Sequence, residues 1–179
     1  MQQIAVRDAA EDDLAACLQL DLSYETDYVW QMDVRDDTGV IAINFRTVRL
    51  PRPMRVVYPR EAQALALAWR KQDCFLVAET SGVVRGYLSM RIDAGPGTAW
   101  ITDIAIGRAW RRQNLGSALL AEAYNRAQGS GLRRLTIETQ TKNYPAICFC
   151  QKHGLNFSGF NDRYYPNHDI ALFFGRNVR

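Results

Sequence analysis

The stretch that decides the fold reads Thr98-Ala99-Trp100-Ile101-Thr102-Asp103-Ile104-Ala105-Ile106-Gly107-Arg108-Ala109-Trp110-Arg111-Arg112-Gln113-Asn114-Leu115-Gly116-Ser117-Ala118-Leu119-Leu120. It predicts a buried strand over 98–106, a basic turn, and an amphipathic helix from Leu115 onward. A helix N-terminus presents unpaired backbone N–H groups and a partial positive charge, and Arg111 and Arg112 add full positive charges. We therefore expect an anion such as a pyrophosphate at this turn. The alternative is that the arginines are solvated and that Gly116 only eases packing.

The common nucleotide-binding loops are missing from this turn. It lacks the glycines and the lysine of GxxxxGK[ST], and it lacks GxGxxG. The sequence of this turn therefore does not favour ATP or NAD as a ligand.

Two strand-like runs, 74–79 and 83–92, precede the strand over 98–106 and predict an antiparallel meander with it. Beyond the turn, apolar residues at helical spacing predict a helix over 115–128, and the next strand is expected over 135–139. A strand, a helix and a strand in this order imply a parallel crossover.

The flanking segments add further strands and helices. The predicted elements are a strand over 3–7, a helix over 9–22, a hairpin of 28–35 with 40–50, helices over 61–70 and 143–153, and strands over 156–159 and 168–174. Pro51 and Pro53 are expected to break the second hairpin strand. The order of elements predicts a mixed-sheet α/β (α+β) protein, and no linker or repeat divides residues 1–179, so we expect a single domain.

Composition sets the broad class. The chain has 179 residues, of which 47% are hydrophobic and 23% charged, as is typical of a globular domain. No apolar run approaches the ~20 residues that cross a bilayer, and the N-terminal residues do not resemble a signal peptide. We therefore expect a cytoplasmic protein without a membrane partner.

Charge and cysteine content exclude two further classes. The net charge of +3 is mild, whereas nucleic-acid-binding domains usually concentrate more basic charge, so no nucleic-acid partner is expected. The 4 cysteines lack the spacing of zinc sites, and Cys148 and Cys150 should point to different sides of a helix. Reduced thiols and no metal site are the predictions.

The turn and the helix start resemble the signature [RQ]-x-x-G-x-[GA] of the GNAT superfamily of acetyl-CoA-dependent N-acetyltransferases. Arg111-Arg112-Gln113-Asn114-Leu115-Gly116 matches it, with Asn114 in place of the first glycine. Because Asn is among the few residues besides Gly that tolerate left-handed backbone angles, this replacement is physically mild.

A second stretch resembles the superfamily pattern N-x-x-A-x-x-[FL]-Y-x-K-x-G-F; it reads Asn143-Tyr144-Pro145-Ala146-Ile147-Cys148-Phe149-Cys150-Gln151-Lys152-His153-Gly154-Leu155. The predicted element order is also similar to the GNAT fold, a mixed, mostly antiparallel splayed sheet flanked by helices. The segment 164–174 resembles the close of the streptothricin acetyltransferase-like branch.

The resemblance implies acetyl-CoA as cosubstrate. The pantetheine arm would pair with the backbone of 104–106, the pyrophosphate would rest on the N–H groups of 112–117, and Asn143 would contact the pantetheine or adenosine side. The cofactor-binding residues expected on this basis are Ile104, Ala105, Ile106, Arg111, Arg112, Gln113, Asn114, Leu115, Gly116, Ser117 and Asn143.

Acetyl transfer also needs a proton for the departing thiolate. The family usually supplies it from the tyrosine of the second motif, where this chain has Cys150. A thiol has an unperturbed pKa of about 8.5 against about 10 for a phenol, but its reach is shorter and its hydrogen bond weaker. Cys150 is therefore either the acid or a small residue lining the pocket. Otherwise Tyr144, Tyr164 or Tyr165 is the acid, or the thiolate leaves without a donor.

The amine must also lose a proton before it attacks. Asp103 lies on the strand beside the cofactor turn, where acidic residues of the family often act, so it is the expected base or amine anchor. Glu79 and Glu138 are the reserve candidates, and each has an ordinary alternative as an exposed carboxylate at a strand edge.

The N-terminal third is where the superfamily varies its acceptor site. Acidic residues interleaved with aromatics over 21–37 would favour a cationic amine, or they form a solvated loop with hairpin aromatics in the core. The arginines over 46–60 could meet the 3′-phosphate of CoA or an acidic partner, or lie on an exposed strand face.

The resemblance thus implies an acyltransferase that moves an acetyl group from acetyl-CoA to a primary amine of a small cationic acceptor, such as a streptothricin-like antibiotic or a polyamine, by direct transfer in a ternary complex. A protein or peptide amine is the rival acceptor. A weakly catalytic acyl-CoA-binding sensor of GNAT fold is the alternative from another class. Because dimers are frequent in this superfamily, a homodimer is left open.

Overall fold

The computed structural model describes residues 3–57, 65–66, 69, 71–93, 95 and 97–178. Its elements are β1 (Ile4–Asp8), α1 (Asp13–Leu18), β2 (Tyr24–Asp37), β3 (Val40–Val56), β4 (Cys74–Thr80), β5 (Val83–Asp93), β6 (Thr98–Ile106), the 3-10 turn η1 (Arg108–Trp110), α3 (Leu115–Gly129), β7 (Arg134–Gln140), α4 (Tyr144–Lys152), β8 (Asn156–Asn161) and β9 (Ala171–Asn177). Most of the helix predicted over 61–70 lies outside the described residues.

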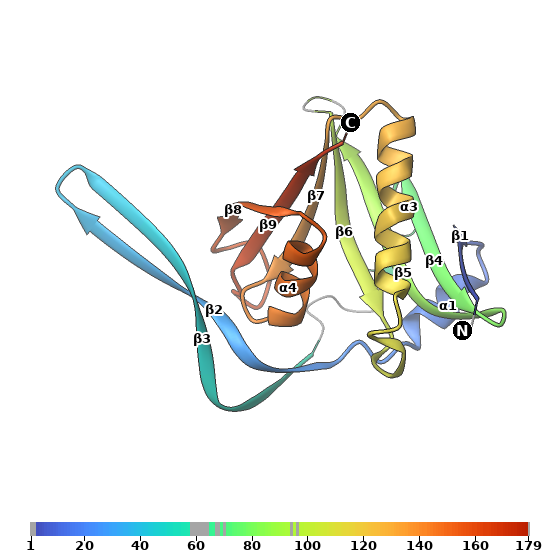
Figure 1. The fold of residues 1–179 in the computed structure, drawn as a ribbon, viewed down its shortest axis with the longest axis horizontal. Helices are drawn as coiled ribbons and strands as arrows, with labels where there is room; N and C mark the ends of the chain where they lie inside the picture. The colour runs from blue at the N-terminus through green and yellow to red at the C-terminus, as the bar shows by residue number, and fades with distance from the viewer. Residues whose placement is uncertain are drawn as a thin grey trace.

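The main sheet has 7 strands in the order β1-β4-β5-β6-β7-β9-β8 (Figure 1). All neighbours pair antiparallel except β6 and β7, which pair parallel across the α3 crossover. The predicted meander, crossover and mixed, mostly antiparallel sheet are thus confirmed.

The parallel pairing of β6 and β7 is short. It runs only from Thr98, opposite Arg134, to Ile101, opposite Ile137. Beyond these residues the two strands part, and α4 packs against β7 beside the opening. The sheet is therefore splayed at the carboxyl ends of β6 and β7.

The core has a layer on each face of the sheet. Leu76 on β4 packs into the cluster that contains Leu119 and Ala123 of α3. Val77, the next residue of β4, packs into a second cluster with Cys17 of α1. The alternation along the strand explains this division, because successive side chains of a strand point to opposite faces.

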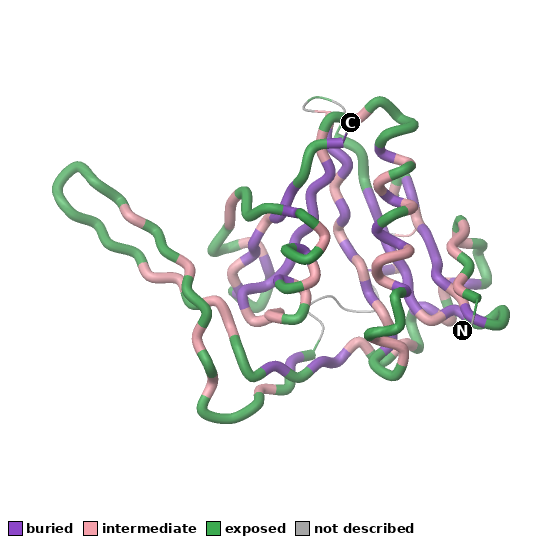
Figure 2. The backbone as a smooth tube through the Cα atoms, viewed as in Figure 1, coloured by how far each residue is buried: buried purple, intermediate pink, exposed green. Residues whose placement is uncertain are grey.

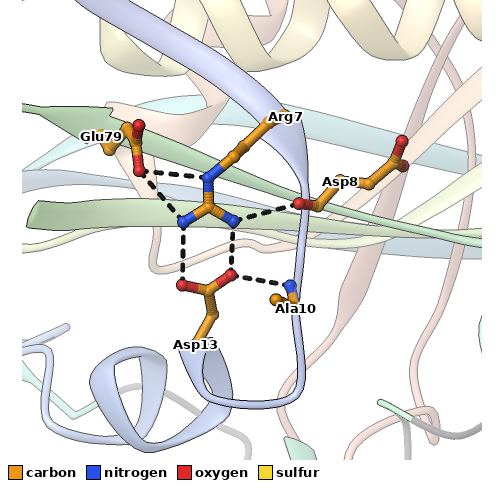
Figure 3. A network of polar contacts seen from close by, with 5 residues as sticks. All are labelled: Arg7, Asp8, Ala10, Asp13 and Glu79. Atoms are coloured by element: carbon orange, nitrogen blue, oxygen red, sulfur yellow. Dashed lines mark hydrogen bonds and ion pairs between the residues drawn. The ribbon is translucent and has the colours of Figure 1, made fainter. Parts of the chain in front are cut away.

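A charged network anchors α1 to the sheet (Figure 3). Arg7 on β1 donates to both carboxylate oxygens of Asp13 at 2.6 and 3.0 Å, and its Nε donates to Glu79 at 3.2 Å. Asp13 also accepts from the backbone N–H of Ala10 at 2.8 Å. The hydrogen bonds from Arg7 hold the pKa of Asp13 below its usual value.

The hairpin of β2 and β3, here called the arm, forms a 2-stranded sheet of its own and extends away from the body (Figure 1). The hairpin prediction is confirmed, but the predicted break at Pro51 and Pro53 is wrong, because β3 continues to Val56. The register shifts between Thr26 and Tyr28, so 50–53 lie opposite this irregularity, where prolines need not donate to the ladder.

Other predicted boundaries also differ from the structure: β2 begins at Tyr24 rather than at 28, and two further differences have a local cause. The helix predicted over 9–22 spans only Asp13–Leu18. Beyond it, Asp21 accepts from the N–H of Ser23 at 2.9 Å, a local turn that competes with helix. The strand predicted over 168–174 spans Ala171–Asn177 instead, and His168 has a left-handed φ of 61°, which a strand does not accommodate.

Candidate active site

A cleft occupies the opening between β6 and β7. Its lining comes from both strands, from α4 and from the loop between β8 and β9: Thr102, Asp103, Ile104, Ile137, Glu138, Thr139, Gln140, Asn143, Ala146, Phe149, Cys150 and Tyr165. The predicted site residues Asp103, Ile104, Asn143, Cys150 and Tyr165 are therefore brought together. Glu79, the other reserve base, does not line the cleft. It accepts a hydrogen bond from Arg7 in the network that anchors α1.

A β-bulge directs Asp103. The register pairs Ser89 with Asp103 and Met90 with Ile101, so that Thr102 is the extra residue. The hydroxyl groups of Thr102 and Ser89 lie 2.7 Å apart, and the Ser89 hydroxyl donates to Oδ2 of Asp103 at 3.2 Å. The carboxylate is only 4% exposed, and the bulge and Ser89 fix its direction. The alternation of apolar and polar residues along β6 does not indicate the bulge.

Glu138 faces the cleft from the opposite strand. It is 7% exposed, and its Oε2 accepts from Trp100 Nε1 at 2.7 Å and from the hydroxyl of Tyr164 at 2.6 Å. Asp103 and Glu138 thus place two buried carboxyl groups in one cleft. The ordinary alternative for Glu138, an exposed edge carboxylate, is wrong.

The loop that carries Tyr164 and Tyr165 is fixed by Asp169. This carboxylate, 6% exposed, accepts from Gln140 Nε2 at 2.6 Å and from Asn167 Nδ2 at 2.9 Å, and it forms an ion pair with Lys142. Gln140 itself lines the cleft. The tyrosines of the loop are therefore held against the cleft by buried polar contacts.

Cys150 lies in the wall of the cleft and is 1% exposed. Burial raises the pKa of its thiol to about 12. An acid of that strength and exposure is a poor proton donor near neutral pH, so the packing role is favoured over the acid role. Cys148 is exposed, which confirms that the two cysteines point to different sides of α4.

The cofactor turn has two left-handed residues, Arg112 with φ 64° and Asn114 with φ 68°. Asn114 is the residue before α3, and its carbonyl accepts from the N–H of Ala118 at 2.9 Å. The left-handed angle is the one that the glycine of the signature would adopt with ease, and Asn tolerates it. The first N–H groups of α3, from Leu115 to Ser117, have no carbonyl one turn earlier to bond.

The start of α3 lies against α4 and the end of β6. A Cβ built on Gly116 would lie 3.4 Å from Cε2 of Phe149 and 3.8 Å from Cγ1 of Ile106. Ser117 Oγ lies 3.1 Å from Nε2 of His153, whose pKa is lowered by burial. A larger side chain at 116 would therefore press against Phe149, which lines the cleft.

Arg111 is bound to the backbone. Its Nε donates to the carbonyl of Ile106 at 2.9 Å, and its Nη1 donates to the carbonyl of Ser23 at 2.8 Å. Burial lowers the pKa of its guanidinium. We interpret Arg111 as a residue that holds the turn against the segment just before β2. Arg112 and Gln113 are exposed at the turn.

Three other predicted cofactor residues differ in exposure. Ala105 is buried in the cluster on the α1 face, so only its backbone can serve a ligand on the cleft side. Leu115 is buried in the other core cluster. Asn143 caps α4, its Oδ1 accepting from the N–H of Ala146 at 3.1 Å, while it also lines the cleft.

The described residues contain neither a candidate metal site nor a candidate membrane-spanning helix. Within them, no group of three or more His, Cys, Asp and Glu side chains is placed to hold a metal ion. None of the helices in that part of the chain is both long and apolar enough to cross a membrane.

The sequence matches a known protein family and is similar to named relatives. Residues 44–155 match the acetyltransferase (GNAT) family. Over a comparison of 122 residues that covers 62% of the chain and 80% of the relative, the chain is 30% identical to a protein of Bacillus subtilis (strain 168) named "Putative [ribosomal protein bS18]-alanine N-acetyltransferase". It is 24% identical over 164 residues to the streptothricin acetyltransferase of Streptomyces lavendulae, covering 89% of the chain and 85% of the relative.

Solved structures share the fold over nearly the whole chain. A nourseothricin acetyltransferase superposes with a TM-score of 0.84 at 22% identity, covering 98% of this chain and 99% of that one. A "putative streptothricin acetyltransferase" from Bacillus anthracis str. Ames, in complex with acetyl coenzyme A, gives a TM-score of 0.78 at 18% identity with the same coverage.

Proposed function

The chain belongs to the acetyltransferase (GNAT) family and is an acyltransferase, and from that premise we propose that it acetylates a primary amine of a small cationic acceptor, such as a streptothricin-like antibiotic or a polyamine. Transfer is direct, with acetyl-CoA and the amine bound together. The observation that carries the acceptor class is the pair of buried carboxyl groups, Asp103 and Glu138, in one cleft. Carboxylates in a site shielded from water attract an ammonium group far more strongly than they would in solvent.

The cofactor site is built from the residues of the turn. The N–H groups at the start of α3 and the exposed Arg112 would bind the pyrophosphate. Because β6 loses its β7 partner after Ile101, the backbone of 102–106 offers hydrogen-bonding groups on the cleft side for the pantetheine arm. A side chain larger than glycine at 116 would press against Phe149, which lines the cleft, and against Ile106.

The proton transfers are assigned to residues of the cleft. Acetyl-CoA supplies the activated acetyl group. Asp103 anchors the ammonium form of the acceptor and accepts one of its protons, so that the nitrogen lone pair is free to attack. Tyr165, which is 7% exposed in the cleft, is the proposed donor of a proton to the departing thiolate. Glu138 holds the charge of the acceptor and does not need to move a proton.

A peptide N-terminus is the second candidate acceptor. It is favoured by the relative that is 30% identical and named for alanine N-acetylation of a ribosomal protein. An N-terminal ammonium would use the same pair of carboxyl groups, so the two acceptor classes differ in the shape of the group that carries the amine.

The test is thiol release from acetyl-CoA with a panel of amines: streptothricin, spermidine, an aminoglycoside, and peptides with an N-terminal alanine or an internal lysine. Calorimetric titration of acetyl-CoA alone accompanies it. Turnover on the small cationic amines supports the proposal, whereas turnover on the alanine peptide alone transfers the function to the second acceptor. Tight binding of acetyl-CoA with no turnover on any amine overturns the catalytic proposal in favour of a sensor, and the absence of binding overturns the cofactor site.

A further inference from the structure

His153 ends α4 beside the first turn of α3. Its Nε2 lies 3.1 Å from the hydroxyl oxygen of Ser117, and its ring lies 4.5 Å, centroid to centroid, from that of Phe149, which lines the cleft. The side chain is half-buried, although the C-terminal end of α4 is mostly exposed and green in Figure 2. The imidazole therefore contacts both helices at the place where α3 begins.

Ser117 is the third residue of α3 and can donate to an anion in two ways. Its backbone N–H is among the first of the helix, which lack an acceptor one turn earlier, and the proposed pyrophosphate site uses these groups. Its hydroxyl group has one proton to donate and lone pairs that accept. A hydroxyl that donates to His153 has no proton left for an anion, whereas a hydroxyl that accepts from His153 has its proton free.

The protonation state of His153 decides between these two arrangements. A neutral imidazole has one donor and one acceptor nitrogen, so its Nε2 can accept the proton of the Ser117 hydroxyl. An imidazolium can only donate, and it also adds a full positive charge beside the start of α3. Protonation of His153 therefore makes the first turn of α3 a stronger binding site for an anion.

The surroundings of His153 favour the neutral ring as long as no anion is bound. Burial is the largest cause of its lowered pKa, and the charges of Lys152 and of Arg176 on β9 lower it further. Arg176 donates to the carbonyl of His153 at 3.2 Å, and its guanidinium lies 4.5 Å from the ring centroid of Tyr124 on α3. The C-terminus of α4 acts in the opposite direction, because its partial charge is negative. A diphosphate at the start of α3 would add negative charge and favour the imidazolium.

We propose that His153 is a positioning residue of the acetyl-CoA site: its protonated ring donates to Ser117, and the Ser117 hydroxyl then donates to the diphosphate of the cosubstrate. Binding of acetyl-CoA therefore takes up a proton where the free protein has a neutral His153. By linkage, the affinity for acetyl-CoA rises as pH falls toward the pKa that His153 has in the free protein. The inference rests on the proposed cofactor site and does not depend on which amine the cleft accepts.

An NMR titration of the imidazole Cε1–Hε1 signals of the full chain, with and without acetyl-CoA and with no amine present, tests the charge of the ring. The chain has 2 histidines, and His153→Gln and His168→Asn assign their signals. We expect acetyl-CoA to raise the pKa of His153, and the signal of the exposed His168 is the internal control. An unchanged pKa of His153 in a protein that binds acetyl-CoA overturns the proposal. Absence of binding overturns the cofactor site and, with it, the inference that rests on it.

Calorimetric titration of acetyl-CoA at about pH 6 and about pH 8 measures the effect on affinity. Because a phosphate such as the 3′-phosphate of CoA also titrates at about pH 6, the ratio of the two affinities is compared with that of His153→Gln, which shares this background. We expect the ratio to be at least about threefold larger in the wild type, since a rise of one pKa unit on binding corresponds to a tenfold preference for the protonated protein.

His168→Asn is the matched control for this titration, because asparagine tolerates the left-handed φ of 61° at that position. It should keep the wild-type ratio. Equal ratios in the wild type and in His153→Gln overturn the proposal, as does an equal loss in His153→Gln and His168→Asn. Near-UV circular dichroism at both pH values checks that each variant is folded.

Substitutions of Ser117 separate the hydroxyl group from the charge of the ring. Ser117→Ala removes the hydroxyl, whereas Ser117→Thr keeps it. We expect the ratio of affinities to shrink at least about twofold in Ser117→Ala, because a hydrogen bond to a charged phosphate is lost, and to be retained in Ser117→Thr. Equal ratios in the wild type and in Ser117→Ala overturn the part that the hydroxyl has in the proposal.

Discussion

The hydroxyl of Tyr164 donates to Oε2 of Glu138 over 2.6 Å, and this bond connects the loop between β8 and β9 to the wall of the cleft. The same oxygen accepts from Trp100 at 2.7 Å, so two donors fix the carboxylate. Hydrogen bonds to a charged carboxylate are stronger than those between neutral groups. The position of the negative charge in the cleft thus depends on a loop residue as well as on the sheet.

Glu138→Gln keeps the volume of the side chain and removes its charge. If Glu138 holds the ammonium of the acceptor, KM for a cationic amine should rise at least about tenfold, while the affinity for acetyl-CoA changes little. Steady-state kinetics with varied amine, together with titration of acetyl-CoA, measure the two effects separately. Glu122→Gln on α3 is the control, since Glu122 pairs with Arg126 on the same helix. An unchanged KM for the amine would remove Glu138 from the acceptor site.

Asn114 should tolerate replacement by Gly better than by Ala. A β-carbon in the left-handed region costs about 1 kcal/mol or more, and Asn114 has a φ of 68°. Urea denaturation should therefore show a loss of stability for Asn114→Ala and little loss for Asn114→Gly, with weaker acetyl-CoA binding only in the former. The control Asn125→Ala, at an exposed site within α3, should gain a few tenths of a kcal/mol from helix propensity. Equal effects at 114 and 125 would contradict the role of the turn.

Cys150→Ala should leave the rate of acetyl transfer within about threefold of wild type, whereas loss of a general acid typically costs about a hundredfold or more. Its stability should fall by about 1 kcal/mol because the side chain is buried, and that of the exposed Cys148→Ala should not. Because burial raises the pKa of the thiol to about 12, the pH–rate profile should keep its shape in Cys150→Ala. A hundredfold loss of rate would restore the thiol as the acid.

The bond between Arg7 and Asp13 should make folding depend on acid pH. The folded-state pKa of Asp13 lies below its unfolded value of about 3.9, so the carboxylate stabilises the fold above that pH. This contribution is lost as pH falls through the folded pKa. The stability difference between wild type and Asp13→Asn should therefore be full at neutral pH and shrink below about pH 4 in urea denaturation.

The same substitution in an Arg7→Met background is the control for that experiment. Without its partner, Asp13 should no longer stabilise the fold more at neutral pH than at acid pH, because the hydrogen bond from Arg7 is the largest cause of the lowered pKa and desolvation, the next largest, raises it. A difference that persists unchanged in Arg7→Met would assign the effect to another group.

The segment from β6 to α3 was predictable because its signals are local. Apolar residues define the strand, Asn114 allows the left-handed start, and the helical face of α3 is regular, so β6 has the predicted bounds and α3 begins where expected. The hairpin was found for a similar reason, since its strands alternate around a glycine turn. Local patterns of this kind need no knowledge of distant partners.

The features that sequence reasoning missed depend on contacts between distant segments. The sequence predicts that Arg111 meets an anion, whereas its guanidinium donates to the backbone carbonyl of Ser23, 88 positions away. The sequence ranks Glu138 only as a reserve candidate, because the donors that fix it, Trp100 and Tyr164, come from another strand and a loop. The bulge at Thr102 arises from pairing with β5, which no single-strand pattern reveals.

The central claim is that the amine is activated in the cleft between β6 and β7. The rate of thiol release from acetyl-CoA in Asp103→Asn tests this claim most directly. The matched control is Asp93→Asn, an exposed residue at the end of β5. We expect kcat/KM for the amine to fall at least about a hundredfold in Asp103→Asn, with acetyl-CoA affinity retained, and to stay at the wild-type value in Asp93→Asn. Wild-type turnover by Asp103→Asn would contradict the assignment of the cleft as the site of transfer.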